Sequence, residues 1–292
     1  MAPSESAAGK SAAAQADLNH LIRELREKTG AGIMDCKRAL TETGGSFEEA
    51  LTFLRKKGLA DAAKKSARVT KEGLVAYAVA GSAGAIVELN CETDFVARTP
   101  EFQELGDALA RKAALGEIQR PEEGTPLVQP VFSKLGENMG LRRLTRLELK
   151  GPGLIAGYIH LGAKKGALIE LAAASPEAAK SEALSGLAKE LLLQIVGLSP
   201  RYVSRAEVPA ADIEKEREIY TELLRKEGKP EAAIPKIVEG KINKLFFQSF
   251  CLLDQPSVRD NKTPVSSLIE EAMRKLPGGM IRVRFARYQL GE

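Results

Sequence analysis

An acidic and an aromatic residue stand side by side in residues 90–98, which read Asn-Cys-Glu-Thr-Asp-Phe-Val-Ala-Arg. This run follows strand-forming residues and precedes Pro100, so Asp94 and Phe95 are predicted to lie on a short loop anchored by a strand. On such a loop they can enter a groove of another protein, where a carboxylate would disturb a magnesium ion or a phosphate network. Alternatively, Phe95 packs as a hydrophobic staple on a helix that begins near Pro100.

Residue types that carry covalent catalysis or bind metals are sparse. Cys36, Cys91 and Cys251 lie far apart without a CxxC pair, which indicates a reducing intracellular environment. Tetrahedral zinc sites use clustered cysteines and histidines, and this chain has only two histidines. We therefore predict no catalytic residue, no metal and no cofactor, and a protein that is not an enzyme.

Glycine-containing segments imitate nucleotide-binding loops but lack their context. Gly-Lys-Ser at 9–11 has Ser4 where a phosphate-binding loop begins with glycine. Gly-Pro-Gly at 151–153 leads into a predicted strand, so a dinucleotide would meet no helix N terminus there. Gly-Ser-Ala-Gly at 81–84 joins two predicted strands and is interpreted as a hairpin turn.

The composition is that of a globular protein, with 44% hydrophobic and 28% charged residues. The longest uncharged stretch, residues 73–87, is shorter than the roughly 20 residues of a membrane span. A net charge of +4 with both signs intermixed argues against a direct nucleic-acid partner. Residues 1–16 lack the features of a signal or transit peptide, so we expect a disordered tail on a cytoplasmic protein. A mitochondrial or plastid form whose transit peptide is absent remains the alternative.

Three short helices are predicted in residues 17–57. Asp17 precedes a helix over 18–28, two glycines separate it from a helix over 33–42, and Ser46 with Glu49 forms a capping box for the third. So small a module is expected to dock on the rest of the protein. The basic, alanine-rich residues 58–71 are interpreted as a partly helical linker.

An internal repeat organises the remainder. Gly-Leu-Val-Ala at 73–76 returns as Gly-Leu-Ile-Ala at 153–156, and Gly-Ala-Ile-Val-Glu-Leu at 84–89 returns as Gly-Ala-Leu-Ile-Glu-Leu at 166–171. Each unit reads as strand, turn and strand, followed by a helix and a third strand. Helices are predicted at 100–114 and 175–196, and third strands at 141–150 and 280–288. The pattern predicts two related α+β subdomains, residues 72–151 and 152–292, each an antiparallel sheet with helices on one face.

A helical hairpin is predicted to interrupt the second subdomain at 211–247. Its second helix carries apolar residues at gaps of four, four and three, namely Ile234, Val238, Ile242 and Leu245. This is the spacing of an antiparallel coiled coil. An exposed hairpin of this kind contacts another chain or another part of the fold.

Several long motifs in order resemble one family. Residues 25–40, Leu-Arg-Glu-Lys-Thr-Gly-Ala-Gly-Ile-Met-Asp-Cys-Lys-Arg-Ala-Leu, resemble the opening signature of elongation factor Ts. Residues 92–98 resemble its second signature, and Lys-Leu-Gly-Glu-Asn-Met at 134–139 with Arg142 and Arg143 resembles its third. The resemblance spans about residues 17–288.

The resemblance implies a guanine-nucleotide exchange factor for elongation factor Tu, which displaces magnesium and promotes GDP release without covalent chemistry. It implies an α+β fold with an N-terminal UBA-like three-helix module, two repeated subdomains and the hairpin insertion. The hairpin relates in this family to dimerisation, so a homodimer or a 2:2 complex is an open alternative. Longer members carry a further C-terminal helix, which we expect this chain to lack.

The resemblance also assigns candidate residues. Thr93, Asp94, Phe95 and Val96 match the loop that dislocates magnesium. Contacts to the partner are implied for Arg26, Ile33, Met34, Lys37, Leu135, Gly136, His160, Val258 and Arg259. From the residues alone, Ile33 and Met34 are equally interpretable as core, Arg26 and Lys37 as solvated charges, and His160 as a structural histidine.

Two other classes of function stay open at this level. A scaffold built on the three-helix module would bind a ubiquitin-like protein, and its 93–96 loop would be irrelevant. An RNA-binding component of the translation apparatus would show steep salt dependence, which the small net charge disfavours.

Overall fold

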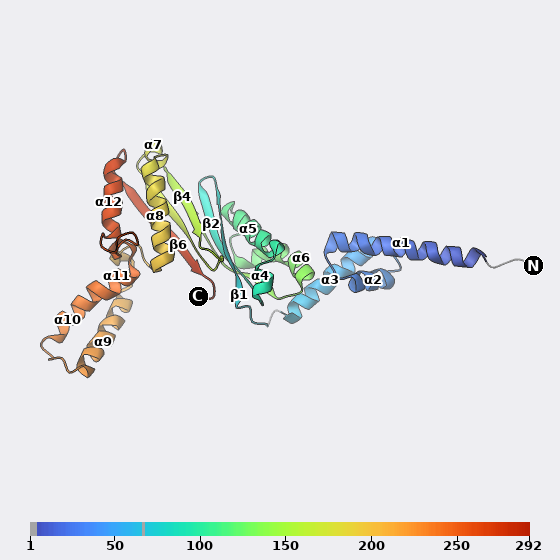
Figure 1. Cartoon of the computed structure of the whole chain (residues 1–292), viewed down its shortest axis with the longest axis horizontal. Coiled ribbons are helices and arrows are strands. Elements are labelled where there is room, and N and C mark those ends of the chain that lie inside the picture. The colour runs from blue at the N-terminus through green and yellow to red at the C-terminus, as the bar shows by residue number, and fades with distance from the viewer. Residues whose placement is uncertain (1–4, 66–67) are drawn as a thin grey trace, which may run out of the picture.

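The structure, a computed structural model, describes the backbone of residues 5–65 and 68–292 and the side chains of residues 17–58 and 68–292. The molecule is elongated, with a helical module at one end, two sheets flanked by helices in the middle, and a helical hairpin projecting at the other end (Figure 1). The predicted α+β class with three N-terminal helices is confirmed.

The N-terminal module consists of three helices: α1 Glu5–Thr29, α2 Ile33–Glu42 and α3 Phe47–Lys65. They enclose a small core formed by Ile22, Leu25, Ala31, Cys36, Ala39, Leu40, Ala50 and Leu54. The Ser46 hydroxyl accepts from the Glu49 N–H at 3.4 Å, which is half of the predicted capping box. Gly30, at φ +70°, allows the sharp turn after α1.

The start of α1 differs from the sequence prediction. The helix begins at Glu5, so the disordered tail expected over 1–16 is a helix from Glu5 onward, while residues 1–4 lie outside the described part. Alanine has the highest helix propensity of all residues, and the alanine-rich run continues the helix beyond its packed face. The expected linker is helical as far as Lys65.

The middle of the molecule holds two three-stranded antiparallel sheets. Sheet A has the order β1-β2-β3 and sheet B the order β4-β5-β6. The strands are β1 Glu72–Ala80, β2 Ala83–Cys91, β3 Met139–Glu148, β4 Gly153–Ile159, β5 Lys165–Ala173 and β6 Ile281–Gln289. The two predicted repeats are thus strand hairpins completed by a third strand.

Helices cover one face of each sheet. On sheet A lie α4 Asp94–Ala97, α5 Pro100–Ala114, the 3-10 turn Pro121–Gly124 and α6 Thr125–Leu135. On sheet B lie α7 Pro176–Ala179, α8 Glu182–Leu198 and α12 Val265–Lys275. Helix α5 has the bounds expected from sequence because Thr99 caps its start and Pro100 occupies its first turn.

The uncovered faces of the two sheets pack on each other, which gives a helix–sheet–sheet–helix arrangement (Figure 1). The core between them consists of Val75, Ile86, Leu147, Ile155, Leu168, Ala286 and Tyr288. Gly84 and Gly166, equivalent in the repeats, permit this close approach. A Cβ on Gly84 would lie 2.7 Å from Ile155, and one on Gly166 would lie 3.2 Å from Val75.

The hairpin is formed by α9 Ala210–Lys226 and α10 Ile234–Lys241, followed by a π-helical turn Ile242–Phe246 and α11 Phe247–Phe250. Ile234, Val238 and Ile242 are buried as predicted, but Leu245 is 48% exposed and Phe246 replaces it in the core. The π turn adds one residue to the helix and moves the apolar stripe by one position. No helix among the described residues combines the length and apolar character that crossing a bilayer requires.

Candidate partner-binding site

The 93–96 loop is a tight turn between β2 and α5. Thr93 caps α4, because its hydroxyl accepts from the Val96 N–H at 3.4 Å. Val96 is buried in the core under sheet A, whereas Phe95 is 80% exposed. The hydrophobic staple is therefore wrong for Phe95, and Val96 is the residue that anchors the turn.

Asp94 lies beside Phe95 on the same turn. Its carboxylate accepts from Arg98 at 2.8 Å, and both side chains are substantially exposed. Exposed ion pairs contribute little and open readily, so this carboxylate is accessible to a charged group of a partner. Asp94 and Phe95 thus present an acidic and an aromatic side chain to solvent from a turn that Val96 anchors in the core.

Leu135 and Gly136 end the helix beside this loop. Leu135 is partly buried against the core of sheet A, and Gly136 closes α6 in the left-handed conformation at φ +75°. Glu137, the next residue in the chain, contacts the 93–96 loop through Thr93.

The four candidate residues of the N-terminal module all point outward. Ile33 and Met34 are 54% and 70% exposed, so their interpretation as core residues is wrong. Arg26 and Lys37 are also exposed. Two adjacent exposed apolar side chains flanked by cations form a surface suited to protein contact.

The β4–β5 turn, which carries His160, shares a groove with the 93–96 loop. Ile159, Gly162 and Ala163 of this turn and Asp94, Ala97 and Arg98 line one groove of about 890 Å³. The turn is held on β1 by the Val75 N–H, which donates to the Ala163 carbonyl at 2.7 Å, and by the Lys164–Glu72 ion pair. His160 is exposed, and its Nδ1 lies 3.1 Å from the Tyr158 hydroxyl.

Sequence analysis missed Leu161, which is 94% exposed beside His160. An apolar residue inside a two-strand turn was the available signal, because turns are usually polar. Val258 and Arg259 lie apart from the groove, against α8. Arg259 pairs with Glu190 at 2.9 Å, and Val258 is 41% exposed.

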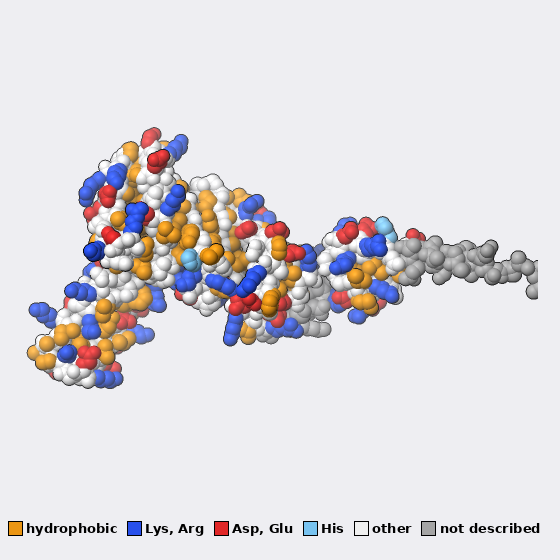
Figure 2. Space-filling view, viewed as in Figure 1, with side chains coloured by type: hydrophobic (Ala, Val, Ile, Leu, Met, Phe, Trp, Pro, Cys, Tyr) orange, Lys and Arg blue, Asp and Glu red, His pale blue; other side chains and the backbone are white. Residues whose placement is uncertain are grey.

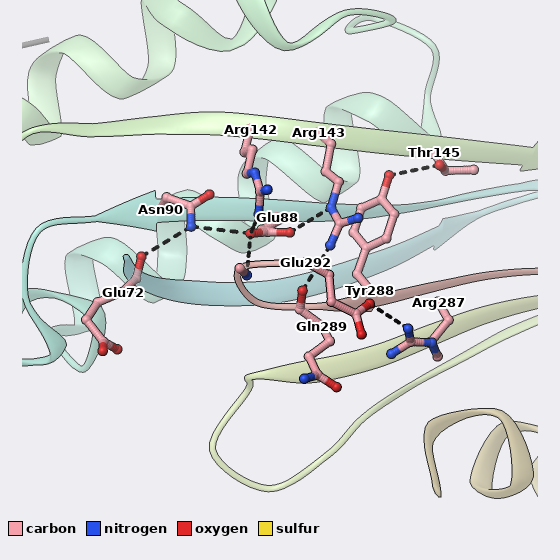
Figure 3. Close-up of polar contacts among 11 residues, drawn as sticks. Glu72, Glu88, Asn90, Arg142, Arg143, Thr145, Arg287, Tyr288, Gln289 and Glu292 are labelled. Atoms are coloured by element: carbon pink, nitrogen blue, oxygen red, sulfur yellow. Dashed lines mark hydrogen bonds and ion pairs between the residues drawn. The ribbon is translucent and has the colours of Figure 1, made fainter. Parts of the chain in front are cut away.

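A buried carboxylate fastens the end of β6 to sheet A (Figure 3). Glu88 is fully buried and accepts from Arg142 at 2.8 Å, Arg143 at 2.7 Å and the Gly291 N–H at 3.1 Å. Arg143 also donates to the Gln289 carbonyl at 2.9 Å. Burial by itself raises the pKa of Glu88, but these donors outweigh it and leave the pKa below its ordinary value.

Replacing Glu88 by glutamine is expected to flatten the acid dependence of stability. The folded pKa lies below the unfolded one, so the stabilisation is present above the unfolded value and is lost as the pH falls through the folded value. At pH 7 the variant should lose about 2 kcal/mol. Urea unfolding of both proteins between pH 3 and 7 measures this, and parallel curves would contradict it.

The cysteine thiols of the described residues are buried. Burial raises the pKa of Cys91 to about 12 and that of Cys251 to about 11, so both thiols are neutral at physiological pH. Among the described residues, no group of three His, Cys, Asp or Glu side chains is placed to hold a metal ion. Figure 2 shows basic and acidic side chains intermixed on the visible face, with exposed hydrophobic side chains among them.

Comparison with known proteins covers nearly the whole chain. The family model described as Elongation factor TS matches residues 92–292. The chain is 45% identical over 280 residues to "Elongation factor Ts" of Symbiobacterium thermophilum, covering 93% of this chain and 91% of that protein. It is 41% identical over 275 residues to "Elongation factor Ts" of Nitratidesulfovibrio vulgaris strain DP4, with 93% and 95% covered. For "Elongation factor Ts" of Prosthecochloris aestuarii, the identity is 41% over 286 residues, with 92% and 97% covered.

Proposed function

Because the chain belongs to the elongation factor Ts family, we propose that it is the guanine-nucleotide exchange factor for elongation factor Tu in translation elongation. It binds the GDP-bound GTPase, displaces magnesium and promotes GDP release, after which GTP binds. No covalent bond is made or broken. The named relatives are bacterial proteins, and the proposed place of action is the cytoplasm, where translation occurs.

The exchange activity follows from differential binding. A factor that binds nucleotide-free elongation factor Tu more tightly than the GDP complex must lower GDP affinity by the same ratio. A coupling free energy of about 4 kcal/mol corresponds to roughly a thousandfold. The factor therefore acts by stabilising the empty state, and its effect is expected mainly in the rate of GDP dissociation.

The observation that carries the mechanism is the 80% exposure of Phe95 on a turn whose next two residues, Val96 and Ala97, are buried. Burying an exposed aromatic side chain in a partner removes its apolar surface from water, which is favourable, and that free energy is available to separate the partner's segments. Asp94 beside it brings negative charge, which weakens the hold of phosphates and acidic ligands on magnesium.

Three further surfaces complete the proposed contact. Arg26, Ile33, Met34 and Lys37 bind from the N-terminal module, and Leu135 and Gly136 support the loop. His160 and the neighbouring Leu161 contact a second region of elongation factor Tu. Val258 and Arg259 are assigned a further contact on the helical side of sheet B.

The helical hairpin supports a proposed homodimer. Ile219, Leu223 and Leu245 are 48%, 43% and 48% exposed, although the hairpin already has its own core. Such apolar residues on a projecting element favour association. Sedimentation velocity should show a dimer that Leu223→Glu converts to monomer, and a concentration-independent monomer for the unaltered chain would contradict this role.

The test of the proposed function is release of fluorescent GDP from elongation factor Tu in excess unlabelled nucleotide. Substoichiometric amounts of this protein should accelerate release in many turnovers. A folded sample that leaves the rate unchanged with a cognate partner would overturn the proposal. A ubiquitin-like binding assay with the same sample would then examine the scaffold alternative.

A further inference from the structure

We propose that Glu137 is a positioning residue for the 93–96 loop and holds Asp94 and Phe95 in the orientation that exchange requires. Its carboxylate does not belong to the set of partner contacts described above. This inference rests on the proposed function, because positioning matters only if the loop acts on the partner. It adds a residue that controls how the loop is presented.

Both oxygens of the Glu137 carboxylate bind the first residue of the loop. Oε2 accepts from the Thr93 N–H at 3.0 Å, and Oε1 accepts from the Thr93 hydroxyl at 2.7 Å. The same hydroxyl oxygen accepts from the Val96 N–H at 3.4 Å as the cap of α4. One carboxylate therefore fixes the residue that starts the helical turn carrying Asp94 and Phe95.

The neighbouring residues make the reciprocal contact. Glu92 Oε1 accepts from the Asn138 N–H at 2.6 Å, and the Asn138 side chain donates to the Arg68 carbonyl at 2.9 Å. Residues 92–93 and 137–138 thus exchange carboxylate-to-backbone hydrogen bonds in both directions. Hydrogen bonds to ionised acceptors are shorter and stronger than neutral ones. These reciprocal hydrogen bonds therefore fix the position of residues 92–93, at the start of the loop.

The helix that carries Asp94 and Phe95 needs such an external hold. Helix α4 spans only Asp94–Ala97. A single helical turn is unstable by itself, because forming it orders several residues for one hydrogen bond. Val96 anchors the turn from inside the core, and Glu137 fixes its start from outside.

Glu137 also links the 93–96 loop to the C-terminal end of α6, on which the N-terminal module packs. It directly follows the end of α6, where Lys134 pairs with Glu101 at 2.6 Å. A Cβ built on Gly30 would lie 3.2 Å from the Lys134 Cβ, so the module rests on the same end of α6. The loop and the module are therefore positioned by one helix end, which keeps their two contact surfaces in register.

Replacing Glu137 by alanine is expected to slow GDP release at saturating factor about tenfold. The reason is that a small displacement of Asp94 and Phe95 from the orientation that acts on the partner costs rate steeply. The affinity for nucleotide-free elongation factor Tu should change much less, since the other contact surfaces remain. Glu137→Gln should retain most activity, because its amide oxygen accepts from the Thr93 N–H and its amide N–H donates to the hydroxyl. Glu148→Ala is the matched control: an exposed glutamate at the far end of β3, it should leave exchange unchanged.

Two measurements separate positioning from general destabilisation. Hydrogen exchange should accelerate in residues 93–98 of Glu137→Ala and stay unchanged in the core strands. In a Phe95→Leu background, Glu137→Ala should slow exchange far less than in the unaltered chain. A normal rate of GDP release for Glu137→Ala would overturn the positioning role. So would a double variant whose loss of rate equals the product of the losses of the two single variants.

The amide hydrogen-exchange measurement on the loop does not depend on whether the protein accelerates GDP release. If the unaltered chain does not accelerate GDP release, the proposed function fails, whatever the loop protection shows. If the chain does accelerate GDP release and the Glu137→Ala loop keeps its protection, only the positioning role fails. Circular dichroism and melting of each variant show that these outcomes refer to folded protein.

Discussion

Phe95→Ala is expected to slow catalysed GDP release from elongation factor Tu about 100-fold, which corresponds to about 2.7 kcal/mol in the activation free energy of release. The phenyl ring is the largest apolar group that the 93–96 loop presents, and alanine removes it without altering the backbone. Stopped-flow release of fluorescent GDP over a range of factor concentrations measures the maximal rate and the half-saturating concentration separately. The maximal rate should carry most of the loss.

The stability of the factor should be unaffected, because Phe95 is 80% exposed and contributes little to the core. The matched control is Leu115→Ala, a similar truncation of a 55% exposed residue at the opposite end of α5, which should exchange normally. If Phe95→Ala and Leu115→Ala behave alike, the loop does not act on the nucleotide site. Equal melting temperatures for all three proteins are required for that comparison.

Leu168→Ala is expected to lower the free energy of unfolding by about 3 kcal/mol, within the range for a fully buried leucine. Leu168 lies between the two sheets with no exposed surface, so truncation leaves a cavity between layers that cannot move together freely. Urea unfolding followed by circular dichroism measures the change. The loss of stability is expected to affect both sheets, because both contribute residues to the core between them.

Leu161→Ala supplies the matched control from the same strand hairpin. Leu161 is 94% exposed, so its truncation should leave the unfolding midpoint unchanged. It should instead weaken binding to elongation factor Tu, because Leu161 is an exposed apolar residue next to His160 in the proposed contact surface. Equal destabilisation by both substitutions would show that the sheets do not pack through Leu168 as described.

Local pattern was sufficient for most of the elements. The repeated Gly-Ala-Ile-Val-Glu-Leu run at 84–89 predicted a strand, and β2 is that strand. Helix α5 has the bounds expected from its cap, and the two repeats fold into similar sheets. Errors occurred where no packing signal existed, as at the start of α1, or where a π turn altered the period, as at Leu245.

The candidate site was less predictable from sequence. Adjacent apolar residues in a short turn look alike in sequence, yet Val96 is buried and Phe95 is exposed. The same holds for Met34 in the N-terminal module, whose exposure depends on how α2 rotates against its neighbours. Glu137 had no individual signal, because its partner Thr93 lies 44 residues away in the chain.

The repeated α+β architecture, the hairpin insertion and the family could be inferred from sequence, because they follow from periodicity, turn residues and long motifs that are local. The outward-facing side chains, the stacking of the two sheets and the carboxylate that holds the 93–96 loop became evident only in the folded molecule. These depend on contacts such as Thr93 with Glu137 and Glu88 with Gly291, which join distant segments. A local pattern states that a residue is apolar or charged, whereas the free energy of burying it depends on the partner that the fold brings to it.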